Sequence, residues 1–165
     1  MSLIGQFAAK LDSKNRVFLP AAFRRSIQTV VAGTDAEDKV KSPEVTLVVR
    51  RDLFENCLVI YPESEWRAEI EKVRSKLNRF DSLQQMIFRK LVSEAQEVTL
   101  DSNGRFLLPK GLLEKVGITQ EVLFVGMERT IEMWAPSVAG KSDVGGEPFM
   151  SDAEFEEGIK QFMAE

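Results

Sequence analysis

Histidine is absent from the 165-residue sequence, and cysteine occurs only once, as Cys57. The missing imidazole excludes His-activated nucleophiles and His general bases, and it removes the commonest ligand of transition metals. The residues present still allow two kinds of enzyme site: a metal site built from carboxylates alone, or the site of an Asp/Glu hydrolase. Cys57 has no second cysteine with which to form an internal disulfide, and its apolar strand pattern places it in the core. We therefore predict a protein that is not an enzyme and that holds no cofactor and no metal.

Long apolar runs are also missing. No stretch approaches the eighteen or so apolar residues of a membrane span, and the N-terminus lacks the basic start and apolar block of a secretory signal. Apolar residues make up 44% and charged residues 29% of the chain, which is typical of soluble globular proteins. We expect a cytoplasmic protein without a membrane partner or a small-molecule substrate.

Charge is distributed unevenly along the chain. The net charge is −4, yet residues 1–28 hold five basic side chains and one acidic one, which leaves −8 for the remainder. The local distribution, and not the total, determines the field that a partner meets. This distribution fits a DNA-binding face on an acidic body and fits an ordinary solvated surface equally well.

One ten-residue motif occurs twice. Residues 11–20 read LDSKNRVFLP and residues 100–109 read LDSNGRFLLP, with six of the ten positions identical. One of the differences exchanges Asn15 for Gly104, and these are the two residue types that most readily accept a positive φ. We predict that each motif forms a tight turn with a left-handed residue directly before an arginine, flanked by strand. Asp12 and Asp101 would accept backbone N–H bonds and hold the turns.

The similarity between the two halves continues beyond the motif. Each motif ends in a proline that opens a short helical segment, and two apolar strands follow in each half, 45–49 with 57–61 and 122–125 with 130–134. For predicting the fold, a duplication of this kind carries more weight than any local sequence pattern. Residues 28–44 are expected to be an exposed loop, and Gly117 is expected just past the end of the second short helix.

Helical patterns lie between the halves and at the end of the chain. Apolar residues recur at helical spacing through 63–95, in two stripes that favour core packing; packing against a neighbouring subunit is the alternative. Ser82 and Gln85 suggest a capping box for the second helix. Residues 137–150 suggest a flexible linker, and Ser151 with Glu154 predicts another capping box for an acidic tail helix. We expect that helix to dock on its own core or on an adjacent subunit.

The doubled Asp-x-x-x-Arg turns, each running into an apolar strand and a proline, resemble the MraZ family of bacterial transcriptional regulators over residues 1–136. The resemblance implies an α+β fold, namely a duplicated swapped-hairpin, AbrB-like (double-psi-type) small β-barrel. The chain would then divide into a first repeat at 1–62, connecting helices at 63–96, a second repeat at 97–136, and a linker with tail helix at 137–165.

The resemblance also implies a ring-shaped homo-oligomer that is associated with the nucleoid. This oligomer would bind short direct repeats in double-stranded DNA upstream of the division and cell-wall gene cluster. Asn15 stands where the family more usually has glycine.

In a DNA-binding protein of this kind, Arg forks would read guanine and lysines would contact phosphates. The candidate DNA-binding residues are Lys10, Lys14, Asn15, Arg16, Arg24, Asn103 and Arg105, and the candidate turn-stabilising residues are Asp12, Asp101 and Gly104. We expect the first motif to bind more strongly, because Glu94, Glu97 and Glu114 offset the charge around the second.

Three alternatives remain open at this point. Both motifs could merely stabilise their own turns. The chain could be a protein-binding module such as an AbrB-like antitoxin. An enzyme on a related barrel would need a concave site close to both Asp12 and Asp101.

Overall fold

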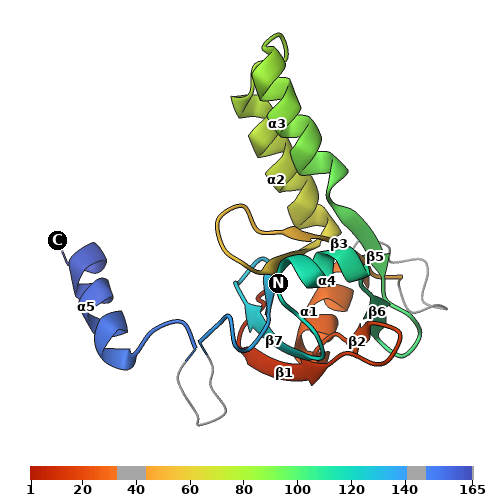
Figure 1. Ribbon diagram of the computed structural model, residues 1–165, viewed down its shortest axis with the longest axis vertical. Helices are drawn as coiled ribbons and strands as arrows, with labels where there is room; N and C mark the ends of the chain where they lie inside the picture. Colours follow the sequence, from red (N-terminus) through yellow and green to blue (C-terminus); the bar gives the residue numbers. More distant parts are fainter. Residues whose placement is uncertain (33–43, 141–147, 165) are drawn as a thin grey trace.

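The computed structural model describes residues 1–32, 44–140 and 148–164. These residues form an α+β structure with two antiparallel sheets (Figure 1), so the predicted class is confirmed. The elements in chain order are β1 (Gln6–Lys10), β2 (Arg16–Phe18), α1 (Ala21–Ala32), β3 (Thr46–Arg51), β4 (Leu58–Pro62), α2 (Glu63–Lys76), α3 (Ser82–Ser93), β5 (Gln96–Thr99), β6 (Arg105–Leu107), α4 (Lys110–Lys115), β7 (Glu121–Gly126), β8 (Ile131–Trp134) and α5 (Asp152–Met163).

The strands of the two halves are interleaved. The larger sheet has the order β1-β7-β8-β4-β3-β5, and a separate two-stranded sheet joins β2 to β6. Every pairing is antiparallel, with Phe7 opposite Phe124 at the β1 edge and Ile60 opposite Ile131 at the junction of β4 and β8. The strands on either side of the first turn, β1 and β2, therefore each pair with a strand of the second half.

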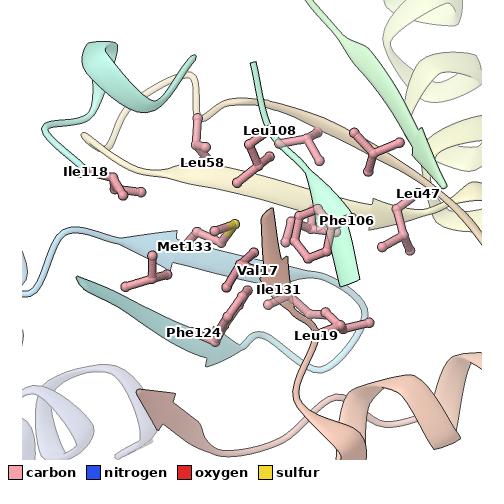
Figure 2. Packing of buried hydrophobic residues seen from close by; sticks show 14 of the residues in the cluster. Val17, Leu19, Leu47, Leu58, Phe106, Leu108, Ile118, Phe124, Ile131 and Met133 are labelled. Carbon is pink, nitrogen blue, oxygen red and sulfur yellow. The ribbon is translucent and has the colours of Figure 1, made fainter. Parts of the chain in front are cut away.

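The hydrophobic core lies between the two sheets and draws on both halves (Figure 2). The larger cluster includes Val17, Leu47, Phe106 and Phe124, each no more than 1% exposed. Alternation along the strands explains this, because the middle residue of β2 and of β6 points inward while its neighbours point outward. Cys57 is fully buried in a second, smaller cluster, so its predicted place in the core is confirmed.

The short helices follow the prolines as predicted. The second, α4, ends in a Schellman motif, in which the Ile118 amide donates to the Leu113 carbonyl oxygen at 3.0 Å and Gly117 has a φ of 73°. The first helix, α1, runs to Ala32 and is longer than expected. Residues 28–32 are therefore helical and not loop, while the rest of that predicted loop, residues 33–43, lies outside the described residues.

The two connecting helices, α2 and α3, form a hairpin that projects from the sheet (Figure 1). Its inner faces are half-buried, but only Leu91 is buried, and Leu83 and Ile87 of the predicted apolar stripe are 70% and 53% exposed. The predicted core packing is thus wrong for the outer face of the hairpin, because no other described element covers it. The predicted capping box of Ser82 with Gln85 is not formed: Asp81 is the N-cap, and its carboxylate accepts from the Gln84 amide at 2.9 Å.

The tail returns to the sheet before its helix begins. The Phe149 ring packs edge-on against Trp134 with centroids 5.2 Å apart, and its amide donates to the Ala139 carbonyl oxygen at 2.8 Å. The Ser151–Glu154 capping box of α5 is confirmed. No described residue of α5 is buried, so the docking on its own core is not observed. The first part of the predicted linker, residues 137–140, is an ordered turn, and residues 141–147 lie outside the described part of the chain. Among the helices of the described residues, none is long and apolar enough to cross a membrane.

Candidate nucleic-acid interface

The first motif closes around one carboxylate. Asp12 Oδ1 accepts hydrogen bonds from the backbone amides of Lys14 and Arg16, both at 2.9 Å, and Oδ2 accepts from Arg16 Nε at 2.8 Å. The Asn15 amide donates to the Asp12 carbonyl oxygen at 3.1 Å. This is an Asx-type closure, in which an aspartate side chain satisfies amides that the turn would otherwise leave to solvent.

The second motif repeats these contacts. Asp101 Oδ1 accepts from the backbone amides of Asn103 and Arg105, both at 2.9 Å, and Oδ2 accepts from Arg105 Nε at 3.1 Å. In both copies the pKa of the aspartate is lowered, chiefly by the backbone amide of the arginine four residues on, with further help from the second amide and the guanidinium. The two carboxylates are therefore held as anions in the folded state.

The predicted left-handed residues are confirmed. Asn15 has a φ of 61° and Gly104 a φ of 82°, each directly before its arginine. Glycine and asparagine are among the residue types that reach this region at the smallest steric cost. A Cβ at Gly104 would also lie 1.9 Å from Arg24 Nη1, so the end of that flexible side chain would have to move aside.

The two arginines are partly exposed. Their side chains are 34% exposed at Arg16 and 25% exposed at Arg105. Nε of each is engaged by its own aspartate, and the terminal amino groups make no hydrogen bond with another described residue. Arg105 also lies 5.7 Å over the ring of Phe18. The guanidinium groups are thus oriented by the turn without being sealed from solvent, and they do not extend freely from a tip.

Pairing between β2 and β6 brings the two motifs together. Val17 lies opposite Phe106 and both are buried, whereas Arg16 lies opposite Leu107 and Phe18 opposite Arg105. Phe18 and Leu107 are 55% and 57% exposed. The outer face of this pair of strands therefore carries two arginines on one diagonal and two apolar side chains on the other. We call these four residues the ribbon face.

The two turns lie at opposite ends of the ribbon face. The backbone continues the pairing on both sides, because the Leu19 amide donates to the Gly104 carbonyl oxygen at 3.0 Å and the Leu108 amide donates to the Asn15 carbonyl oxygen at 3.1 Å. Each turn is thereby fixed by the strand of the other half. Sequence reasoning located both turns but did not predict that they share one ribbon, and it missed Phe18 and Leu107. The period-two alternation of Arg16-Val17-Phe18 contains the signal that would have placed Phe18 beside Arg16.

The other candidate residues flank the ribbon. Lys10 is exposed at the end of β1, Lys14 is exposed on the first turn, and Asn103 is exposed on the second. Arg24 comes from α1 of the first half but reaches the second turn, where Nη1 donates to the Asn103 carbonyl oxygen at 3.4 Å. The second turn therefore gains a cation that its own half does not supply.

A cleft of about 550 Å³ adjoins the second turn. Asp101 and Arg24 are among its lining residues, but Asp12 is not, since the first turn lies at the other end of the ribbon. This cleft is therefore not the concave site near both aspartates that an enzyme would need. No cluster of acidic or cysteine side chains within 1–32, 44–140 and 148–164 has the arrangement of a metal site.

Comparison with known proteins gives one family. The family model described as "MraZ protein, putative antitoxin-like" matches residues 3–90 and again 91–137. Among curated relatives, the transcriptional regulator MraZ of Phocaeicola vulgatus is 39% identical over 163 residues, which is 99% of this chain and 94% of the relative. That of Bacteroides fragilis is 39% identical over 98% of this chain and 91% of its own length, and that of Shewanella frigidimarina is 31% identical over 81% and 79%. The resemblance seen in the doubled turns is thereby confirmed, and the chain belongs to the MraZ family.

Proposed function

We propose that this protein is a sequence-specific, DNA-binding transcriptional regulator that acts as a repressor. The observation that carries the proposal is the ribbon face, which holds two turn-oriented arginines, Arg16 and Arg105, on one exposed surface. The relatives' name, transcriptional regulator MraZ, supports the same class of function.

The ribbon face has the chemistry that base reading requires. A two-stranded ribbon fits the major groove of B-DNA, where the guanidinium group of arginine matches O6 and N7 of guanine. The Asp–Nε bonds hold the two guanidinium groups in place and leave the terminal nitrogens for the bases. Phe18 and Leu107 would contact thymine methyl groups, which are the apolar feature of that groove. Lys10 and Lys14 would bind phosphates, which adds affinity without sequence information.

Both turns contribute to this proposed contact. Of the acidic residues expected to offset the second motif, Glu114 pairs with Lys110 of that half at 3.8 Å, whereas Glu94 pairs with Lys90 of α3 at 2.7 Å. Arg24 adds its charge to the second turn. We therefore propose that the two ends of the ribbon face bind with comparable strength.

One ribbon face is small for a specific DNA complex, because single modules generally bury about 600–1,000 Å² of protein surface. We propose that several copies form a ring-shaped homo-oligomer, in which linked ribbon faces bind short direct repeats and gain avidity. The target would be double-stranded DNA upstream of the division and cell-wall genes, and the protein would act in the cytoplasm at the nucleoid.

We also infer that the interleaved strand pairing is the swapped-hairpin arrangement of AbrB-like proteins. The two repeats would span residues 1–62 and 97–136, with the helices of 63–96 between them. The exchange of β1 and β4 onto β7 and β8 supports this inference.

DNA binding by single-arginine variants tests the proposal. Arg16→Ala and Arg105→Ala should each weaken binding to the DNA upstream of the protein's own gene by about tenfold to a hundredfold, the equivalent of about 1–3 kcal/mol per lost guanine contact. Fluorescence anisotropy against scrambled DNA at several salt concentrations separates base reading from phosphate contact. Arg129→Ala is the matched control, since Arg129 is 76% exposed and ion-paired with Glu65 at 3.6 Å, outside the ribbon face.

The same variants distinguish DNA reading from turn stabilisation. If Arg16→Ala melts much earlier than the control, or if the assembly falls apart, the arginine serves the turn and the proposal fails. The second candidate function is an antitoxin-like protein-binding module, which the description of the matching family favours. Co-purification of a foreign protein at one-to-one stoichiometry, together with no preference for the upstream DNA, would establish that function instead.

A further inference from the structure

The tail helix α5 is preorganised but uncovered. Its capping box is complete, and its apolar residues Phe155, Ile159, Phe162 and Met163 are 55%, 46%, 79% and 73% exposed. Their spacing places them on one face of the helix. A helix of this length is marginal in water unless its apolar face packs against something.

A second uncovered apolar surface lies at the far end of the α2–α3 hairpin. Phe80, Leu83, Met86 and Ile87 are 94%, 70%, 58% and 53% exposed. The inner face of α3 is occupied differently, since Leu91 is buried and Phe88 packs beneath Arg74, whose Cζ lies 5.6 Å from the ring centroid. Leu83, Met86 and Ile87 share one face of α3 by their spacing of three and four residues, and Phe80 lies just before the helix. We call these four exposed residues the hairpin patch.

The charges of the two surfaces are opposite. Residues 72–90, which contain the hairpin patch, carry six basic side chains and one acidic side chain, a net charge of +5. Residues 152–163 of α5 carry four acidic side chains and one basic side chain, a net charge of −3. Complementary charge around two apolar surfaces steers their encounter and discriminates against other partners.

The position of α5 determines which copy it can meet. Phe149, three residues before the start of the helix, packs against Trp134 and donates its amide to the Ala139 carbonyl oxygen. Figure 1 shows α5 well apart from α2 and α3 of the same chain. We propose that α5 of one copy docks on the hairpin patch of a neighbouring copy. This inference rests on the homo-oligomer of the proposed function. The contact is heterologous, so each copy gives one helix and accepts one, and such contacts generate rings when the rotation closes.

Cross-linking between differently tagged chains tests the docking. One chain carries Phe162→Cys and the other Ile87→Cys, and the two are co-expressed and treated with a flexible bismaleimide. The native Cys57 is fully buried and does not compete. We expect a product that contains both tags. Gln161→Cys is the matched control, because it lies on the face of α5 away from the apolar residues and should give much less product.

The remaining outcomes separate this inference from the proposed function. A single-copy mass by light scattering would contradict the homo-oligomer itself. An oligomer without a product containing both tags would overturn only the docking. A chain that carries both cysteines and links only within itself would show that α5 reaches its own hairpin patch, which would also overturn the inference.

A charge exchange tests the electrostatic part. Arg79→Glu with Arg89→Glu on the accepting chain should slow cross-linking several-fold, because like charges then meet. Glu156→Lys with Glu157→Lys on the donating chain should restore the rate. Failure of the exchange to restore it would show that charge does not select this pairing, and the choice of α5 as the occupant would lose its support.

Discussion

Two phenylalanines on the ribbon offer a matched test of the fold and of the proposed face. Phe106 points inward opposite Val17 and is 1% exposed, while Phe18 points outward beside Arg105 and is 55% exposed. The perturbation is the same in each case, Phe106→Ala or Phe18→Ala. The strands are paired with each other, so the local backbone is comparable.

The expected magnitudes differ because the burial differs. Truncating a buried phenylalanine to alanine lowers the free energy of unfolding by about 3–5 kcal/mol, from lost burial and the cavity that remains. Full burial of such a side chain is worth about 1.5–3 kcal/mol, so the buried part of Phe18 contributes about 1 kcal/mol. Its exposed contact with Arg105 adds about 0.5–1 kcal/mol. The two variants should therefore differ by about 2–3 kcal/mol, or about 30- to 150-fold in the unfolding equilibrium constant.

Urea unfolding followed by tryptophan fluorescence measures this difference. All proteins are compared at one concentration, because assembly makes the apparent stability depend on it, and equal m-values are required for the comparison. Phe18→Ala should stay folded and lose DNA affinity, whereas Phe106→Ala should lose both. If Phe18→Ala proved as destabilising as Phe106→Ala, the ribbon face would be covered in the assembly and could not read DNA.

Three further predictions concern charge and backbone. Folding lowers the pKa of Asp12 and of Asp101, so their contribution to stability is present above the ordinary aspartate pKa and is lost as pH falls through the folded pKa. The double variant Asp12→Asn with Asp101→Asn should therefore show a weaker acid dependence of its melting temperature below about pH 4. Burial raises the pKa of Glu132, so the wild type should gain stability from this group as pH falls through its raised folded pKa to the ordinary glutamate pKa. Glu132→Gln should remove that gain in a pH series of melts. At Gly126 an added Cβ would lie 2.4 Å from the Leu3 carbonyl oxygen, so Gly126→Ala should destabilise the protein by at least about 1–3 kcal/mol in urea titration, and an unchanged midpoint would contradict the close approach.

Local chemistry accounts for what the sequence predicted well. The doubled turn, the left-handed residues at Asn15 and Gly104, and the capping box at Ser151 all depend on residues within five positions of one another. Side-chain oxygens accept hydrogen bonds from backbone amides within that range, so the spacing of the residues in the sequence is enough to predict these features.

Long-range pairing explains what the sequence did not predict. Alternation shows that Val17 and Phe106 face the core, but not that they face each other across one ladder. The apolar stripe of α3 likewise did not show which of its residues would be covered. Leu91 packs inward and Leu83 is exposed, because the hairpin projects from the sheet instead of lying on it. Periodicity identifies an apolar face and leaves its partner unspecified. The residues that bind DNA remain a prediction.

The interleaving of the two halves has a consequence for biosynthesis. A nascent chain that has emerged only as far as β4 lacks β7 and β8, so β1 and one edge of β4 have nothing to pair with until residues 121–134 leave the ribosome. Unsatisfied strand edges invite association with other chains, and contacts so distant in sequence form slowly. Premature termination within the connecting helices would thus yield an aggregation-prone fragment instead of a working half-protein.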